Sequence, residues 1–176
     1  EFLGVNYDCC HFAIEFEEPQ NIIAALQKAG IKISKIHLSS ALKTRATKEA
    51  RSALAKFADD VYLHQVIARG ENGKLKFFRD LPNALAEKNF QPSAEWRVHF
   101  HVPLHAPAIL PFENTNDHLL GVLDLLAENP KICSHLEMET YTWEVLPPEL
   151  KSQSVVEQLA GEYDWTLARL KERGLV

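Results

Sequence analysis

The alternation of apolar and polar positions predicts strands and helices in turn along the first part of the chain. The apolar run at residues 2–7 is short enough for a buried strand. Residues 31–38 repeat isoleucine and leucine among Lys and Ser, which predicts a second strand covered by helices. Between these strands a helix is predicted over residues 18–28, and Gly30 supplies its stop.

The rest of the chain continues this alternation, with one local departure. Asn72-Gly73 lies between two short apolar segments and is a strong hairpin signal, so we expect a β-hairpin insertion there. A Pro-rich loop is predicted over residues 103–114. The elements predicted after residue 38 are helix 47–57, strand 61–68, strand 75–78, helix 81–87, strand 96–102, helix 115–126, strand 132–141 and helix 152–173.

Strands that alternate with helices are typical of βαβ units and a parallel sheet. The sequence therefore predicts an α/β fold of about four to five parallel strands with flanking helices and the hairpin insertion. A chain of 176 residues is long enough to bury a sizeable core, so we expect a single domain over residues 1–176.

Composition and charge limit which cellular compartment and which partners the protein is expected to have. A formal net charge of −5 argues against a broad nucleic-acid or anionic-membrane surface. The sequence has no apolar run long enough for a transmembrane helix and no signal-peptide pattern. Its cysteines form no spaced disulfide framework, which favours a reducing, cytoplasmic compartment. Because the chain opens without Met inside a predicted strand, we expect it to be a piece of a longer protein.

Four predicted strands end in side chains that can bind a metal ion. In a parallel β/α architecture the carboxyl ends of successive strands converge on one rim, so residues far apart in sequence could meet in one polar pocket. These residues are Asp8 with His11, His37, His99 with His101, and Glu137 with Glu139.

The residues of the first two strand ends also have ordinary structural interpretations. Asp8 and His11 can be a turn aspartate and an exposed histidine, which is the commoner meaning of an isolated D-x-x-H pattern. His37 lies late in an apolar strand, where a core histidine with satisfied hydrogen bonds is at least as good an interpretation. A metal would hold His37 neutral, with one ring nitrogen oriented by a further acceptor.

His99 and His101 form a more specific pair. On a strand, residues i and i+2 share a face, so both rings point the same way. Two imidazoles repel when protonated and are stabilised by a shared cation, which favours metal or substrate contact over a structural role. Glu137 and Glu139 have the same spacing. Glu139 is the better ligand because it is nearer the strand end, whereas Glu137 is either an orienting partner or solvated.

Other side chains carry weaker signals. Cys9 and Cys10 could ligate zinc, although adjacent cysteines seldom chelate one ion together. His64 lies on an alternating strand and is interpreted as structural. Trp143 would either line the face of a sugar or pack under the terminal helix.

Four short segments together resemble a known superfamily. They are Asp8-Cys-Cys-His11, His37-Leu-Ser-Ser, His99-Phe-His101 and Glu139-Thr. In this order they resemble the second half of the xylose-isomerase-like TIM barrels, which include sugar isomerases, sugar epimerases and endonuclease IV type DNA-repair enzymes. The resemblance implies the C-terminal part of a (β/α)8 TIM barrel whose N-terminal half is absent from this chain. More narrowly, residues 6–13, 61–65 and 139–147 look like the EboE metabolite-traffic proteins, which are associated with export of a secondary metabolite or its precursor.

The resemblance also implies roles for individual residues. Asp8, His37 and Glu139 would be ligands of one divalent metal ion, Mn, Mg or Zn, and the fourth ligand would lie upstream of residue 1. His11 and His101 would contact the substrate or a second metal.

One position departs from the pattern of the repair enzymes. They carry an Asp where this chain has His99, which argues against their trinuclear zinc site. A zinc held by His11, His99 and His101 is still a possible arrangement. Trp143 completes the candidate substrate contacts.

The implied function is a metal-dependent isomerase or epimerase acting on a sugar-like small molecule. Glu139 and His11 are the candidate catalytic residues, because a carboxylate, an imidazole and a divalent ion can polarise neighbouring oxygens and transfer a proton. The alternatives are a non-catalytic metabolite-binding or trafficking protein that keeps the metal pocket, and a zinc-dependent phosphodiesterase. Pairing with the missing barrel half or with a second copy is expected, since half a barrel exposes sheet edges.

Overall fold

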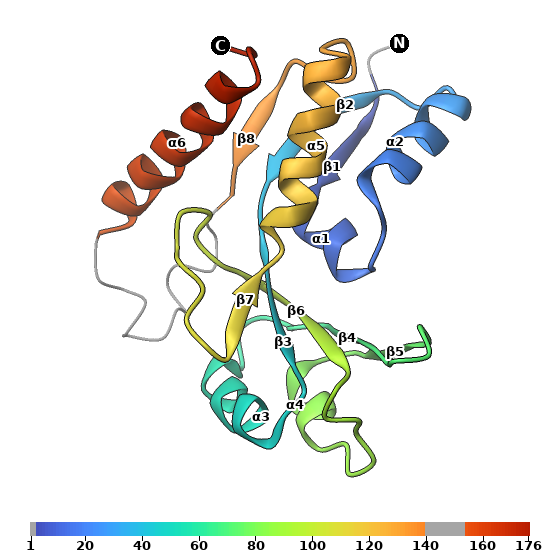
Figure 1. The fold of residues 1–176 in the computed structure, drawn as a ribbon, viewed down its shortest axis with the longest axis vertical. Helices are drawn as coiled ribbons and strands as arrows, with labels where there is room; N and C mark the ends of the chain where they lie inside the picture. The colour runs from blue at the N-terminus through green and yellow to red at the C-terminus, as the bar shows by residue number, and fades with distance from the viewer. Residues whose placement is uncertain (1–2, 140–153) are drawn as a thin grey trace.

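The computed structural model describes residues 3–139 and 154–176, and its strands form two sheets (Figure 1). The first is a parallel sheet of three strands in the order β1-β2-β8. The second is an antiparallel sheet of five strands in the order β5-β4-β6-β3-β7. The strands are β1 Val5–Asp8, β2 Ile33–Leu38, β3 Ala41–Arg45, β4 Val66–Arg69, β5 Leu75–Phe78, β6 Glu95–His101, β7 Phe112–Asn114 and β8 Leu136–Met138.

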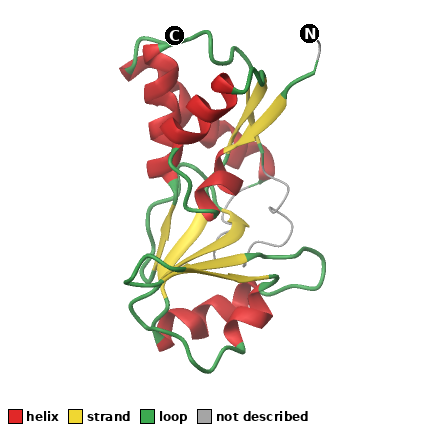
Figure 2. Ribbon diagram, turned by 90° about the vertical axis from the view of Figure 1, so that its right-hand side faces the viewer, coloured by secondary structure: helices red, strands yellow, loops and turns green. Residues whose placement is uncertain are grey.

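Helices pack around both sheets (Figure 2), and local sequence explains where several of them begin and end. Pro19 begins α2 at a position whose N–H has no helical partner, and Gly30 follows the helix in the left-handed region with φ of 67°. A capping box of Ser154 and Glu157 begins α6. The helices are α1 Cys9–Ile14, α2 Pro19–Lys28, α3 Lys48–Leu54, α4 Leu81–Leu85, α5 Asn116–Glu128 and α6 Val155–Glu172, with a 3-10 turn η1 at Ala55–Phe57.

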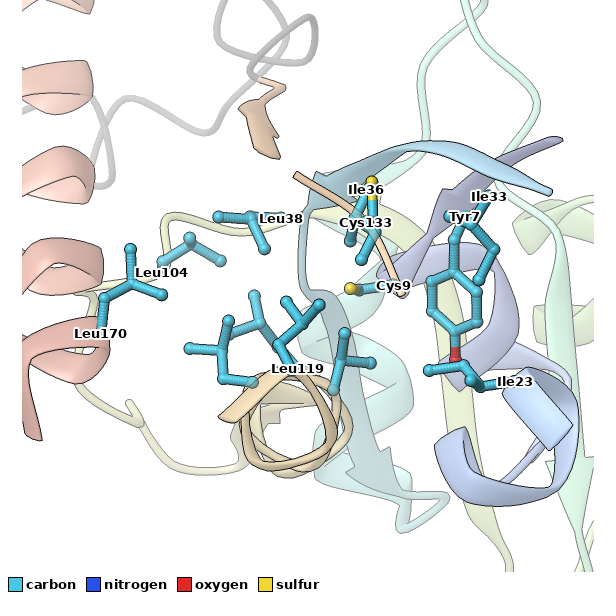
Figure 3. Packing of buried hydrophobic residues seen from close by; sticks show 13 residues of the cluster. Tyr7, Cys9, Ile23, Ile33, Ile36, Leu38, Leu104, Leu119, Cys133 and Leu170 are labelled. Atoms are coloured by element: carbon cyan, nitrogen blue, oxygen red, sulfur yellow. The ribbon is translucent and has the colours of Figure 1, made fainter. Parts of the chain in front are cut away.

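Each sheet has its own apolar core. In the first, Tyr7 and Ile36 from the parallel strands pack with Leu119 of α5 (Figure 3). In the second, Trp96 and Phe100 of β6 belong to one buried group with Leu54 of α3, Phe57 of η1 and Leu81 of α4. These large side chains are buried, so their packing is the main apolar contribution that fixes the two sheets.

One continuous stretch of chain links the two sheets. After β2, the residues Ser39 and Ser40 are buried and lead directly into β3. Thr115 satisfies the polar groups of this crossing: its Oγ1 accepts from Ala41 N at 2.8 Å, and its N–H donates to Ser40 Oγ at 3.1 Å. The crossing therefore carries the chain from the parallel sheet into the antiparallel one without a helix between (Figure 1).

The predicted TIM-barrel half with four to five parallel strands is wrong. The strand that carries His99 and His101, β6, runs antiparallel to both β3 and β4 and lies outside the parallel sheet. A parallel neighbour must be reached through a crossover that covers a sheet face. Because β2 continues straight into β3, strands β4 to β7 join the antiparallel sheet that contains β3, whereas β8 returns to the parallel sheet beside β2.

Individual elements follow the sequence more closely than their arrangement does. The predicted helix α2 and the hairpin are confirmed, with β4 and β5 pairing antiparallel across the Asn72-Gly73 turn. The strand predicted over 61–68 shortens to β4. The strand β3 was not predicted, and β7 lies within the predicted Pro-rich loop. The predicted strand 132–141 is reduced to β8 within the described residues.

Candidate metal centre

Asp8 ends β1 and caps the N-terminus of α1, which fixes the direction of its carboxylate. Its Oδ1 accepts from the N–H of His11 at 3.1 Å and from the hydroxyl of Ser39 at 2.8 Å. Its Oδ2 lies 3.4 Å from Nδ1 of His37. One carboxylate oxygen is thus held by the protein while the other faces the neighbouring strand.

His37 and Glu139 complete a cluster at the carboxyl edge of the parallel sheet. Asp8 pairs with His37 across β1 and β2, and the β8 register places Glu137 beside His37. Glu139 directly follows β8, and its Oε2 lies 3.0 Å from Nδ1 of His37. The ligand atoms of Asp8, His37 and Glu139 all lie within 4.8 Å of one another. This is close to the separation of about 4 Å that two ligands of one ion allow.

The surroundings of the second ring nitrogen of His37, Nε2, also favour a metal site at this cluster. Nε2 is buried, has no hydrogen-bond partner in the described part of the chain, and lies 3.5 Å from Oε1 of Glu137. Ligating histidines commonly direct their other ring nitrogen to a carboxylate. With Nδ1 toward Asp8 and Glu139 and Nε2 toward Glu137, the donor atoms present fit a divalent ion.

The two carboxylates influence each other across the cluster. Burial raises the pKa of Glu139, and the neighbouring Asp8 charge raises it further. Burial also acts to raise the pKa of Asp8, but the His11 N–H, His101 and the Ser39 hydroxyl together bring it below its ordinary value. Two carboxylates placed together in this way are stabilised by a shared cation.

Beside this cluster, β6 presents His99 and His101 on one face, as their spacing predicts. The helix α1 packs over this face, and the ring centroid of the exposed His11 lies 4.3 Å from that of His99. The ring centroids of His99 and His101 lie 5.4 Å apart. Burial lowers the pKa of His99 to about 3 and that of His101 to about 4, so both imidazoles are neutral near pH 7.

Sequence reasoning gave Cys10 only a weak zinc signal and did not single out Asp59. Cys10 offers a sulfur within 4.8 Å of ligand atoms of His99 and His101. The one-turn spacing of Cys10 and Ile14 on a helix was the signal, because it places both on the side facing β6. His64 was interpreted as structural, but the role of its partner Asp59 was not foreseen: Nε2 of His64 lies 2.5 Å from Oδ2 of Asp59.

The structure brings most of the predicted site residues together in two neighbouring clusters. Asp8, His37 and Glu139 form one cluster, and His11, His99 and His101 form another next to it. Trp143 lies outside the described residues.

Comparison with known proteins adds no assignment. The chain matches no protein-family model, no curated protein and no solved structure. Among the residues that the structure describes, no helix combines the length and apolar character needed to cross a membrane.

Proposed function

We propose that this protein is a divalent-metal-dependent enzyme that isomerises or epimerises a sugar-like small molecule. The observation that carries the proposal is the cluster of Asp8, His37 and Glu139, whose ligand atoms lie within 4.8 Å of one another at the ends of parallel strands. Two carboxylates and one imidazole suit Mn, Mg or Zn. The segments around Asp8, His37 and Glu139, which resemble those of sugar isomerases and metabolite-traffic proteins, favour a sugar-like or secondary-metabolite substrate.

Proton transfer is assigned to residues at the open side of the cluster. A bound divalent ion supplies polarisation of substrate oxygens. Glu139, whose Oε2 lies 3.0 Å from Nδ1 of His37, is the carboxylate assigned to accept the proton. His11 is exposed next to His99 and is positioned to donate a proton to, or accept one from, a bound hydroxyl group.

The side chains around the cluster favour hydroxyl groups as substrate contacts. His11, His99 and His101 offer imidazole donors and acceptors, and none of them is a permanent cation. Phosphate recognition ordinarily uses Arg or Lys. A polyhydroxylated ligand therefore suits these groups better than a phosphodiester does.

Metal analysis of the purified, tag-free protein tests the proposal. We expect a tightly bound divalent ion at this cluster, and Asp8→Asn, His37→Ala and Glu139→Gln should each lose it while circular dichroism shows that the fold is retained. His105→Ala is the matched control, because His105 is an exposed imidazole on another loop. Incubation with sugars in D2O should then show solvent deuterium entering at a carbon next to a carbonyl.

The possible outcomes separate the alternatives. A folded protein that binds no Mn, Mg or Zn would overturn the proposal. Metal and sugar binding without deuterium incorporation would indicate a metabolite-binding protein instead. Cleavage of a phosphodiester such as bis-p-nitrophenyl phosphate would indicate a phosphodiesterase.

A further inference from the structure

The two adjacent cysteines at the start of α1 point into different surroundings. Cys9 belongs to the core of the parallel sheet, near Leu119 (Figure 3). Cys10 instead belongs to a small buried group with Ile14, Ala41 and Ile67, on the side of α1 that packs against β6. The helix thus separates two neighbouring thiols, and only Cys10 faces the histidine pair.

The atoms around Cys10 have the composition of a zinc site. Its Sγ and one nitrogen each of His99 and His101 all lie within 4.8 Å of one another. The two histidines share a face of β6, so both can turn toward the same point. One thiolate and two imidazoles are the ligands that zinc and other borderline or soft ions prefer, and three protein ligands leave a fourth position open.

The neighbouring cluster differs in its donor atoms. Asp8, His37 and Glu139 supply mainly carboxylate oxygen, which suits harder ions such as Mn or Mg. The hydroxyl of Ser39 connects the two regions, because it donates to Oδ1 of Asp8 at 2.8 Å and accepts from the N–H of Cys10 at 2.9 Å. The two sets are therefore adjacent but chemically distinct.

We propose that Cys10, His99 and His101 form a second metal site, selective for zinc-like ions, beside the Asp8–His37–Glu139 centre. Binding converts the Cys10 thiol to a thiolate and releases its proton to solvent. The inference deepens the proposed function and rests on it, since the second ion would make that centre dinuclear, with its open position next to the exposed His11.

Cobalt(II) substitution provides the test, since thiolate coordination gives Co²⁺ an intense near-ultraviolet charge-transfer band. Wild-type protein should bind two Co²⁺ ions and show this band. Cys10→Ser should lose the band and one ion, and His101→Ala should weaken it. Cys9→Ser is the matched control, because Cys9 is an equally buried thiol that faces the other core, and it should keep the band.

Three outcomes would overturn the second site: cobalt binding without a thiolate band, a band that persists in Cys10→Ser, or a band lost equally in Cys9→Ser. Asp8→Asn and Glu139→Gln separate the two proposals. If the first centre is absent, these variants leave the amount of bound cobalt unchanged, whereas the thiolate band still decides the Cys10 site.

A second measurement covers the case in which Cys10→Ser fails to fold. In the wild-type protein, zinc at a hundred times its dissociation constant should slow alkylation of Cys10 through local opening by about a hundredfold. Cys133, a buried cysteine outside both metal clusters, should react at an unchanged rate. Equal rates for Cys10 with and without zinc would contradict the site.

Discussion

The hydroxyl of Ser39 donates a 2.8 Å hydrogen bond to Oδ1 of Asp8. Ser39 is 2% exposed and follows β2, so the crossing between the sheets also orients the first residue of the candidate metal centre. The same hydroxyl accepts from the N–H of Cys10. The position therefore serves both clusters although it carries no ligand atom of its own.

Replacing Ser39 with alanine should weaken metal binding. Asp8 would lose one of the two donors that hold Oδ1, and loss of such an orienting partner commonly lowers metal affinity by about 10- to 100-fold. Isothermal titration with Mn²⁺ measures the change. The exposed Ser52→Ala is the control, and an affinity for Ser39→Ala equal to that of Ser52→Ala would show that Ser39 does not orient Asp8.

His64→Ala should reduce stability because the ring joins β6 to the loop between η1 and β4. Nδ1 of His64 lies 2.8 Å from the carbonyl oxygen of His99, and Nε2 lies 2.5 Å from Oδ2 of Asp59. The ring is 1% exposed, so its removal leaves a cavity and unpaired polar groups, which together cost about 2–4 kcal/mol.

Urea unfolding gives the free energy for this prediction. Asp59→Asn keeps a side chain of the same size beside His64, and we expect a smaller loss than for His64→Ala. A His64→Ala variant as stable as the wild type would show that the Asp59–His64 contact is incidental. Cobalt titration of a His64→Ala protein that still folds also reports whether the His99 carbonyl contact positions the His99 ring.

Local sequence signals predicted individual elements, whereas sheet assignment depended on distant partners. Pro19 and Gly30 bound α2, and Gly73 adopts the positive φ that its turn requires. Nothing near Ser40 indicates that the chain continues as a strand. The N–H that donates to the Ser40 hydroxyl belongs to Thr115, which is 75 residues away in the sequence.

The candidate site also has one part that the sequence predicted and one part that depends on distant partners. Asp8 and His37 could be placed together from sequence because they end adjacent parallel strands, and this part of the sheet is parallel. The proximity of Cys10 to His99 could not, since it requires α1 to pack on a strand of the other sheet. The predicted fold class was wrong, but Asp8, His37 and Glu139 still lie together. Their cluster needs only the ends of the three parallel strands β1, β2 and β8.

Glu162 should make the protein less stable as the pH rises through neutrality. This carboxyl on α6 is 3% exposed, and burial raises its pKa to about 7, against the hydrogen bonds from Gln158 and the Leu104 backbone. The folded state therefore holds a proton that the unfolded chain releases near its ordinary pKa of 4.5. Its contribution is fully present below about pH 4.5 and is lost as the pH rises through about 7.

Glu162→Gln should remove this dependence. A glutamine stays neutral, so at pH 8 the variant should be more stable than the wild type by on the order of 3 kcal/mol, while the two should be similar near pH 4.5. Urea unfolding at both pH values measures the difference. The exposed Asp164→Asn on the same helix should show no such gain. Parallel pH profiles for wild type and Glu162→Gln would mean that Glu162 titrates normally.

His118 should produce the opposite pH dependence at the acidic end. Its ring is 6% exposed, and its Nε2 lies 2.9 Å from the hydroxyl of the buried Tyr7. Burial and the charge of Arg97 lower the pKa of His118 to about 4, so the folded state binds fewer protons than the unfolded chain, whose ordinary value is 6.5. Stability is therefore lost as the pH falls from about 6.5 to about 4.

His118→Gln should flatten this part of the profile. The substitution removes the titrating ring, so the loss of on the order of 3 kcal/mol between pH 6.5 and 4 should disappear even though the variant is less stable at pH 7. Combining it with Glu162→Gln separates the two groups, because the single variants change opposite slopes. His105→Ala, which removes an exposed imidazole, should leave the acidic slope unchanged. A slope that survives in His118→Gln would assign the acid sensitivity to another group.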